Sequence, residues 1–210
     1  MHSDKSTLPD DVDVLLLAAG YREDATLDAF IIEHLSDALP RRRILALRAA
    51  LRRDLVTDGV WRTQLLDVDV DVRREALTLI AGAPLGDESL FDLLIHALDD
   101  SDALVVDGAV FALGEHLYAP ALEQLIGVAS DHDDARCRES AIAALGAIGD
   151  DRARPVIVAA LEDKPAVRRR AIVALANFEG PDIEAALARA SEDRDWQVRA
   201  AVDQLSRADE

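Results

Sequence analysis

Apolar residues recur along this chain in a pattern that predicts six similar helices. Counted from one small or apolar anchor residue in each copy, they fall at positions −4, 0, +3, +4 and +7, which is one face of an α-helix. Successive anchors are 32, 33, 32, 30 and 31 residues apart. A period of this length is typical of repeat arrays, whose units bury their apolar faces against their neighbours. The six anchors are Ile44, Ala76, Ala109, Ala141, Ala171 and Val202.

A second apolar stretch precedes most of these helices, so each repeat is predicted to be a helix A, a tight turn and a helix B. The A stretches with the clearest pattern are 90–98, 121–128, 156–161 and 183–190. An Asp seven residues before most anchors suits the N-cap of helix B, and Gly86, Gly149 and Gly180 mark the ends between repeats. We expect residues 1–21 to form a tail and a capping helix near Asp11–Ala19, and residues 22–210 to form six helical pairs.

The recurring pattern Asp-x-x-Val-Arg-x-x-Ala-x-x-Ala-Leu-Gly resembles HEAT repeats, in particular the short type first named from phycobilisome bilin lyases. The stretch 141–161, which reads AIAALGAIGDDRARPVIVAAL, is the most similar. The resemblance extends over residues 24–205 and implies an all-α fold, a right-handed α-solenoid of about six two-helix HEAT-like repeats. It implies little about function, because such arrays serve many roles.

In that family, an Asp and an Arg of successive repeats resemble a stacking ladder. The corresponding positions here lie seven and three residues before the anchor. Two repeats depart from the pattern, because Val106 stands in place of Arg and Lys164 in place of Asp. The four pairs that fit are Asp37/Arg41, Asp69/Arg73, Asp134/Arg138 and Asp195/Arg199.

The charge of the chain argues against nucleic acid and anionic membranes as partners. The formal net charge is −18, whereas phosphate backbones and acidic lipids attract clustered Lys and Arg. Residues 1–10 lack a signal-peptide core, and the apolar stretch Val14–Ala19 is too short to span a bilayer. Cys137 is the single cysteine, which fits a reducing compartment. We therefore expect a cytoplasmic protein.

Enzymes also occur among HEAT-like proteins, and their sites require particular residues. Resemblance to deoxyhypusine hydroxylase implies His-Glu pairs just before the anchors, where two irons would bind. No His occupies those positions here, and no two of the five histidines have the helical spacing that would let them share a metal. We therefore predict no metal and no cofactor. The pairs at those positions are Arg74-Glu75, Asp107-Gly108, Glu139-Ser140 and Arg169-Arg170.

The outward face of the B helices is the predicted binding surface, since B helices line the concave side of such solenoids. Positions −5, −2, +2 and +5 lie opposite the buried stripe. The third repeat stands out, because Leu104 and Phe111 are large and apolar where neighbouring repeats have polar or small residues. Charged residues at position −2 would form the rim of this site; they are Arg74, Asp107, Glu139 and Arg169. The alternative is that Phe111 is buried under an adjacent helix.

These observations favour a non-catalytic protein-interaction or scaffold module. Its partner would be another protein with a basic-apolar segment that binds on the concave face. The alternative function is a HEAT-like enzyme or its subunit, either bilin lyase-like or resembling deoxyhypusine hydroxylase. The missing His-Glu pairs disfavour the hydroxylase.

Overall fold

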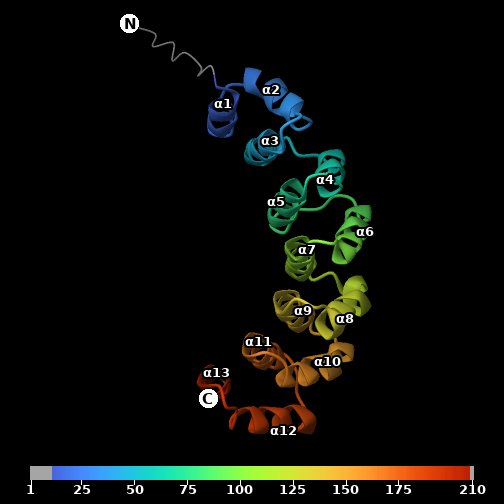
Figure 1. Ribbon diagram of the computed structural model, residues 1–210, viewed down its shortest axis with the longest axis vertical. Helices are drawn as coiled ribbons and strands as arrows, with labels where there is room; N and C mark the ends of the chain where they lie inside the picture. The colour runs from blue at the N-terminus through green and yellow to red at the C-terminus, as the bar shows by residue number, and fades with distance from the viewer. Residues whose placement is uncertain (1–10, 209–210) are drawn as a thin grey trace, which may run out of the picture. The chain divides into compact units, whose positions relative to one another are not determined.

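The computed structural model describes residues 11–208, and their regular structure is entirely helical (Figure 1). The chain divides into an N-terminal unit that ends at Leu90 and a C-terminal unit that begins at Phe91. No helix among residues 11–208 is both long enough and apolar enough to cross a bilayer.

In the described part of the N-terminal unit, from residue 11 on, α1 to α5 form a capping helix and two A–B pairs. The predicted first helix is α1, and it packs against α3. Helices α2 and α4 are the A helices, and they pack against the B helices α3 and α5, which also pack on one another. The bounds are α1 Val12–Ala19, α2 Thr26–His34, α3 Pro40–Arg52, α4 Asp58–Leu65 and α5 Val70–Ile80.

In the C-terminal unit, the B helices α7, α9, α11 and α13 pack in series, and α8, α10 and α12 each pack against the B helix that follows. Within this unit the row of B helices lies on the inner side of the bend (Figure 1). The α-helices are α6 Ser89–His96, which begins at the end of the first unit, α7 Ala103–Glu115, α8 Leu122–Asp131, α9 Ala135–Ile148, α10 Arg154–Ala159, α11 Pro165–Leu175, α12 Pro181–Ala190 and α13 Trp196–Ala208. Short 3₁₀ turns are η1 Ala97–Asp99, η2 Ala119–Ala121, η3 Asp151–Ala153 and η4 Ala160–Glu162.

Small residues let the B helices approach one another closely. A Cβ atom added to Gly114 of α7 would lie 2.9 Å from the Cβ of Ala144 in α9. One added to Gly146 of α9 would lie 2.6 Å from the Cβ of Ala174 in α11. The Ala-Leu-Gly ending of the repeat pattern is therefore a packing requirement, because any side chain there would clash with the next B helix.

The predicted anchors are buried in every repeat except the first. Ala76, Ala109, Ala141 and Ala171 have no exposed surface, and Val202 is also buried.

The predicted anchor of the first repeat, Ile44, is wrong: it is only half-buried, whereas Ala46 is fully buried and lies three residues after Arg43, the arginine that bonds the next repeat. The physical reason is that α3 begins at Pro40 with Leu39 as its N-cap, two residues later than an N-cap at Asp37 would place it.

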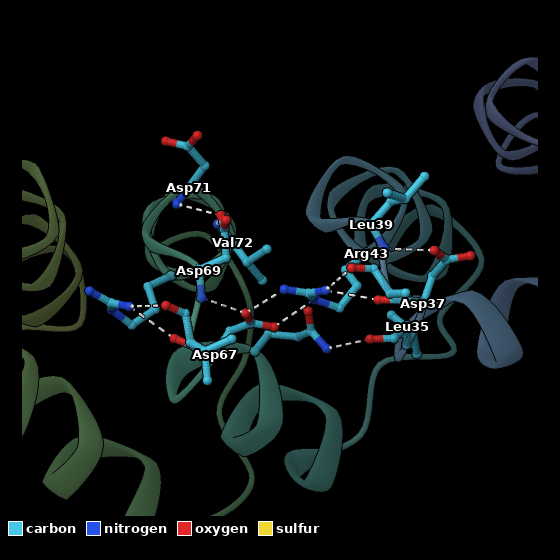
Figure 2. Close-up of polar contacts among 12 residues, drawn as sticks. Leu35, Asp37, Leu39, Arg43, Asp67, Asp69, Asp71 and Val72 are labelled. Carbon is cyan, nitrogen blue, oxygen red and sulfur yellow. Dashed lines mark hydrogen bonds and ion pairs between the residues drawn. The ribbon is translucent and has the colours of Figure 1, made fainter.

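A ladder of Arg and Asp side chains joins successive repeats. In the N-terminal unit, Arg43 donates from Nε and Nη2 to both Asp67 carboxylate oxygens, each at 2.7 Å, and from Nη1 to the Asp37 backbone carbonyl at 2.8 Å. Figure 2 shows the Arg43 guanidinium between the two. In the C-terminal unit, Arg138 and Arg168 make the same bidentate contacts with Asp163 and Asp193.

The acceptors of this ladder differ from the predicted ones. The predicted Asp residues accept backbone N–H groups instead, from Leu39 to Asp37, Asp71 to Asp69, Arg136 to Asp134 and Gln197 to Asp195. This is because an Asp at a helix N-cap, or just before it as Asp37 is, already faces free amides. The ladder carboxylates lie one or two residues before the N-cap of their helix.

Among the predicted ladder arginines, Arg41 does not belong to the ladder: its side chain is 74% exposed and pairs with Asp13. Arg73 and Arg199 donate to the backbone carbonyls of Asp67 and Asp193.

One rung is absent at the junction of α7 and α9. Val106 occupies the arginine position and is buried. His132 occupies the carboxylate position, where its Nδ1 accepts the backbone N–H of Asp134 at 3.0 Å. Both members of the ion pair are thus replaced together, so neither charge is left buried without its partner.

Candidate partner-binding face

The outward side of the B helices in the C-terminal unit carries a row of exposed apolar side chains. Phe111 on α7 is 52% exposed, Val173 on α11 is 56% exposed, and Trp196 at the start of α13 is 67% exposed. The side chain of Phe111 is therefore not covered by a neighbouring helix of its unit. Large apolar side chains in contact with water are energetically unfavourable unless a ligand covers them, and several along one surface are typical of binding sites.

The first of two hollows on this side, which we name the Phe111 pocket, lies between α7, α9 and α11 and has a volume of about 270 Å³. Phe111 and Glu115, one turn apart on α7, form one wall. Arg170 of α11 forms the opposite wall. Small residues of α9 form the floor between them. The lining residues are Phe111, Gly114, Glu115, Glu139, Ser140, Ala143, Ala144, Ala147 and Arg170.

The second hollow, which we name the Trp196 pocket, has a volume of about 390 Å³. It shares Glu139 and Arg170 with the Phe111 pocket, so the two hollows adjoin. Its lining residues are Glu139, Ala166, Arg169, Arg170, Val173, Trp196, Gln197, Ala200, Ala201 and Gln204.

The charged side chains between the pockets have ion-pair or hydrogen-bond partners within the protein. The Arg170 guanidinium lies 3.5 Å from the Glu139 carboxylate, with 43% and 29% of the two side chains exposed. Arg169 donates to Gln197 Oε1 at 2.7 Å. A partner can compete for these groups at modest cost, because exposed ion pairs contribute at most about 1 kcal/mol.

The structure brings together part of the predicted site. Phe111 and Glu139 line the Phe111 pocket, and Arg169 lines the Trp196 pocket. Asp107 accepts a hydrogen bond from Ser140, which also lines the Phe111 pocket.

Two predicted residues lie elsewhere. Leu104 is exposed on α7 but lines neither pocket. Arg74 lies on α5 in the N-terminal unit, where it pairs with Asp71 at 2.9 Å.

Trp196 was not among the predicted site residues. It lies six residues before its anchor, in the first turn of α13, which is outside the positions considered for the outward face. Its one signal in the sequence is a large aromatic residue outside the buried positions −4, 0, +3, +4 and +7 of the repeat.

Cys137, His34 and His116 each contact neighbouring groups of the fold. The buried Cys137 thiol donates to the Ala103 carbonyl at 3.1 Å, and burial raises its pKa to about 11, which disfavours the reactive thiolate. His34 Nδ1 lies 2.8 Å from the Phe30 carbonyl oxygen, and His116 packs edge-on against Phe91. Residues 11–208 contain no group of three or more His, Cys, Asp or Glu side chains placed to hold a metal ion.

Comparison with solved structures supports the fold. The crystal structure of YibA from Escherichia coli is 20% identical, with a TM-score of 0.66 over 90% of this chain and 71% of that one. An engineered protein is 20% identical, with a TM-score of 0.64 over 87% of this chain and 95% of its own. A designed armadillo repeat protein in complex with the peptide (KR)4 is 17% identical, with a TM-score of 0.56 over 92% and 97%. At these identities the likeness establishes the fold alone.

Comparison of the sequence identifies the family. No curated protein matches the chain. The family described as HEAT repeats matches residues 60–145 and, overlapping them, residues 91–166. These matches together cover about half of the chain and coincide with its most regular helical pairs. The chain therefore belongs to the HEAT repeat family and has the all-α fold of α-solenoids.

Proposed function

We propose that this chain is a non-catalytic interaction or scaffold module that binds a segment of another protein along the B helices of its C-terminal unit. The observation that carries the proposal is the pair of adjoining pockets, each with an exposed aromatic ring at its wall. Aromatic side chains dominate the binding energy of protein interfaces, because they bury a large area at little entropic cost.

The chemistry of the face favours a basic-apolar segment. Apolar side chains of the partner would cover Phe111, Val173 and Trp196, and basic side chains would meet a chain of net charge −18. Electrostatic complementarity of this kind speeds association and selects among partners. The designed armadillo repeat protein of similar fold binds (KR)4, a basic peptide, which gives a precedent for such a ligand.

The alternative, a HEAT-like enzyme, has less support from the side chains. At the positions where a hydroxylase-like enzyme would need His-Glu pairs, Glu139 pairs with Arg170, Arg169 bonds Gln197, and Asp107 accepts from Ser140. Membership of the short phycobilisome-lyase type, and with it a bilin lyase-like activity, stays a prediction, as does a cytoplasmic location.

Affinity capture with matched baits tests the proposal. The wild-type chain and the Val68→Ala control, which alters a 95% exposed side chain of the N-terminal unit, should recover the same partner. Phe111→Ala and Trp196→Ala should each weaken binding of the purified partner by about 2 kcal/mol or more. Their free energies of unfolding should change by less than about 0.5 kcal/mol, as at other exposed sites. Equal affinity for all four proteins would refute the proposed face.

A further inference from the structure

We infer that the Phe111 pocket receives an arginine side chain of the partner segment, with the guanidinium stacked on Phe111 and paired with Glu115. This inference rests on the proposed function and specifies which chemical group the pocket recognises. Three independent observations support it: the exposed ring, an unpaired carboxylate beside it, and the absence of lysine and arginine from the sequence between Arg74 and Arg136.

The ring and the carboxylate are placed for one shared ligand. Phe111 and Glu115 are four residues apart on α7, so their side chains lie on the same face of the helix, and both line the pocket. A cation over an aromatic face is attracted by the quadrupole of the ring. A carboxylate one turn away can accept hydrogen bonds from the same cation.

Glu115 lacks a cation in the free protein. It is the last residue of α7, where the negative end of the helix dipole disfavours a carboxylate. No ion pair or hydrogen bond joins its side chain to another of residues 11–208. The guanidinium in the pocket, that of Arg170, comes from the opposite wall and is engaged by Glu139. A ligand cation would therefore relieve an unfavourable charge without displacing an internal partner.

The sequence around Glu115 also favours a cation that comes from a ligand. Between Arg74 and Arg136 the sequence contains no lysine or arginine, although it contains 13 aspartates and glutamates. Helices α6, α7 and α8 thus lack any permanently positive side chain that could neutralise Glu115. Arg136, the next arginine along the chain, is engaged by Asp134 at 3.0 Å.

Arginine fits the pocket better than lysine or a small organic ligand. A planar guanidinium can stack on a ring and donate two parallel hydrogen bonds to a carboxylate, whereas an ammonium is a compact, strongly hydrated charge. The volume of about 270 Å³ lies at the lower limit of pockets that hold drug-sized molecules, which begin at about 300 Å³. It suits one side chain of a longer segment that continues over the shared Glu139–Arg170 edge.

The test is a titration of the full-length chain with two synthetic nonapeptides at physiological salt, followed by NMR shifts of backbone amides. One peptide carries a single arginine flanked by leucines. In the other, citrulline, the uncharged isostere, replaces the arginine. The arginine peptide should saturably shift the amides of Gly114 and Ala143, and the citrulline peptide should bind about tenfold more weakly, as expected for loss of a charged hydrogen-bond partner.

Two variants with the same change in net charge separate the pocket from the general field of the chain. Glu115→Gln should weaken the arginine peptide about tenfold and leave the citrulline peptide unchanged. Glu179→Gln, on an exposed residue that lines neither pocket, should bind both peptides as the wild type does. Thermal unfolding of both variants checks that they are folded.

Other results overturn the inference in distinguishable ways. Equal affinity for the two peptides, or equal effects of the two variants, would reject the arginine pocket while peptide binding itself still supports the proposed function. Absence of shifts at Gly114 and Ala143 with either peptide would also reject the arginine pocket. The capture experiment with Phe111→Ala and Trp196→Ala then decides separately whether the face binds a partner at all.

Discussion

The junctions α7–α9, α9–α11 and α11–α13 each bring two B helices into contact, but their polar chemistry differs. Gly114 lies on Ala144 in the first, and Gly146 lies on Ala174 in the second. Ion pairs of Arg138 and Arg168 close the later two junctions, whereas Val106 and His132 occupy those places in the first. Since α7 and α9 pack closely without an ion pair, small residues suffice to bring two B helices together.

The comparison also gives a physical reason why Val106 and His132 replace both members of the ion pair. A buried ion pair roughly offsets its own desolvation, so replacing both members by uncharged groups changes stability little. Losing one member leaves a buried charge, which costs far more. Where it is present, the rung joins successive repeats in addition to the helix packing.

The largest effect is expected when one rung loses its carboxylate. Asp193→Ala should lower the free energy of unfolding by about 3 kcal/mol, because Arg168 stays buried without its partner. His132→Ala is the matched control, since both residues accept the backbone N–H two positions ahead and only Asp193 also binds a guanidinium. The control should lose about 1 kcal/mol, the value of a capping bond. Chemical unfolding measures both, and equal losses would contradict a structural role for the rung.

The next effect concerns the helix packing at the two junctions where a glycine lies on an alanine. Gly146→Ala should destabilise the chain by about 2 kcal/mol, because the strain of overpacking exceeds the gain in helix propensity. The added methyl would lie 2.6 Å from the Cβ and 2.8 Å from the Cα of Ala174. Gly114→Ala should cost less, since the nearest distances there are 2.9 and 3.1 Å. Thermal unfolding ranks the two variants, and a stabilised Gly146→Ala protein would show that the helices separate freely.

The fold was predictable because its cause is local and repeated. Ala76, Ala109 and Ala141 recur at a nearly fixed period, and each is fully buried. Because a longer side chain has no room at such a position, few other alignments of the repeats are possible. The first repeat was misaligned by two residues because three consecutive arginines, 41–43, offered three candidate donors and Asp37 resembled an N-cap. The start of α3 at Pro40 decides how the first repeat aligns with the others. A proline at the first helical position is itself a signal for a helix start, and in the sequence it competed with Asp37.

The candidate site was predictable only in part, because it depends on contacts between repeats. Helical geometry points Phe111 outward, but the angle alone did not exclude burial under a neighbouring helix. The pairing of Glu139 with Arg170 joins residues 31 apart through side-chain conformations that no spacing specifies. Trp196 lies six residues before its anchor, which is not one of the four positions that were predicted to face outward.

A smaller effect is expected from rebuilding the missing rung. Val106→Arg alone should destabilise by about 1–3 kcal/mol, because it places a charge at a buried position. Adding His132→Asp should recover about 1–2 kcal/mol of that loss, measured as the coupling energy of a double-mutant cycle. The reason is that Arg138 and Asp163 make this contact in the next junction. A coupling energy of zero would show that the two junctions differ in backbone geometry as well as in side chains.

The smallest effect is the acid sensitivity that each rung adds. The hydrogen bond from Arg168 lowers the pKa of Asp193 below its ordinary value, and Arg138 does the same for Asp163. A carboxyl group whose folded pKa is depressed stabilises the fold above its unfolded pKa of about 3.9, and this contribution is lost as pH falls through the folded pKa.

Arg168→Met should therefore lose less stability than the wild type when the pH falls from 5 to 2.5. This window extends roughly one unit above and more than one unit below the unfolded pKa of Asp. Val106→Met changes the same position in the rungless junction and removes no arginine–carboxylate pair, so its pH dependence should match that of the wild type. Urea unfolding at several pH values measures all three proteins. If Arg168→Met is as acid-sensitive as the wild type, the ionised rung does not stabilise the junction, and the buried apolar contacts of Ile172, Val198 and Val202 hold it alone.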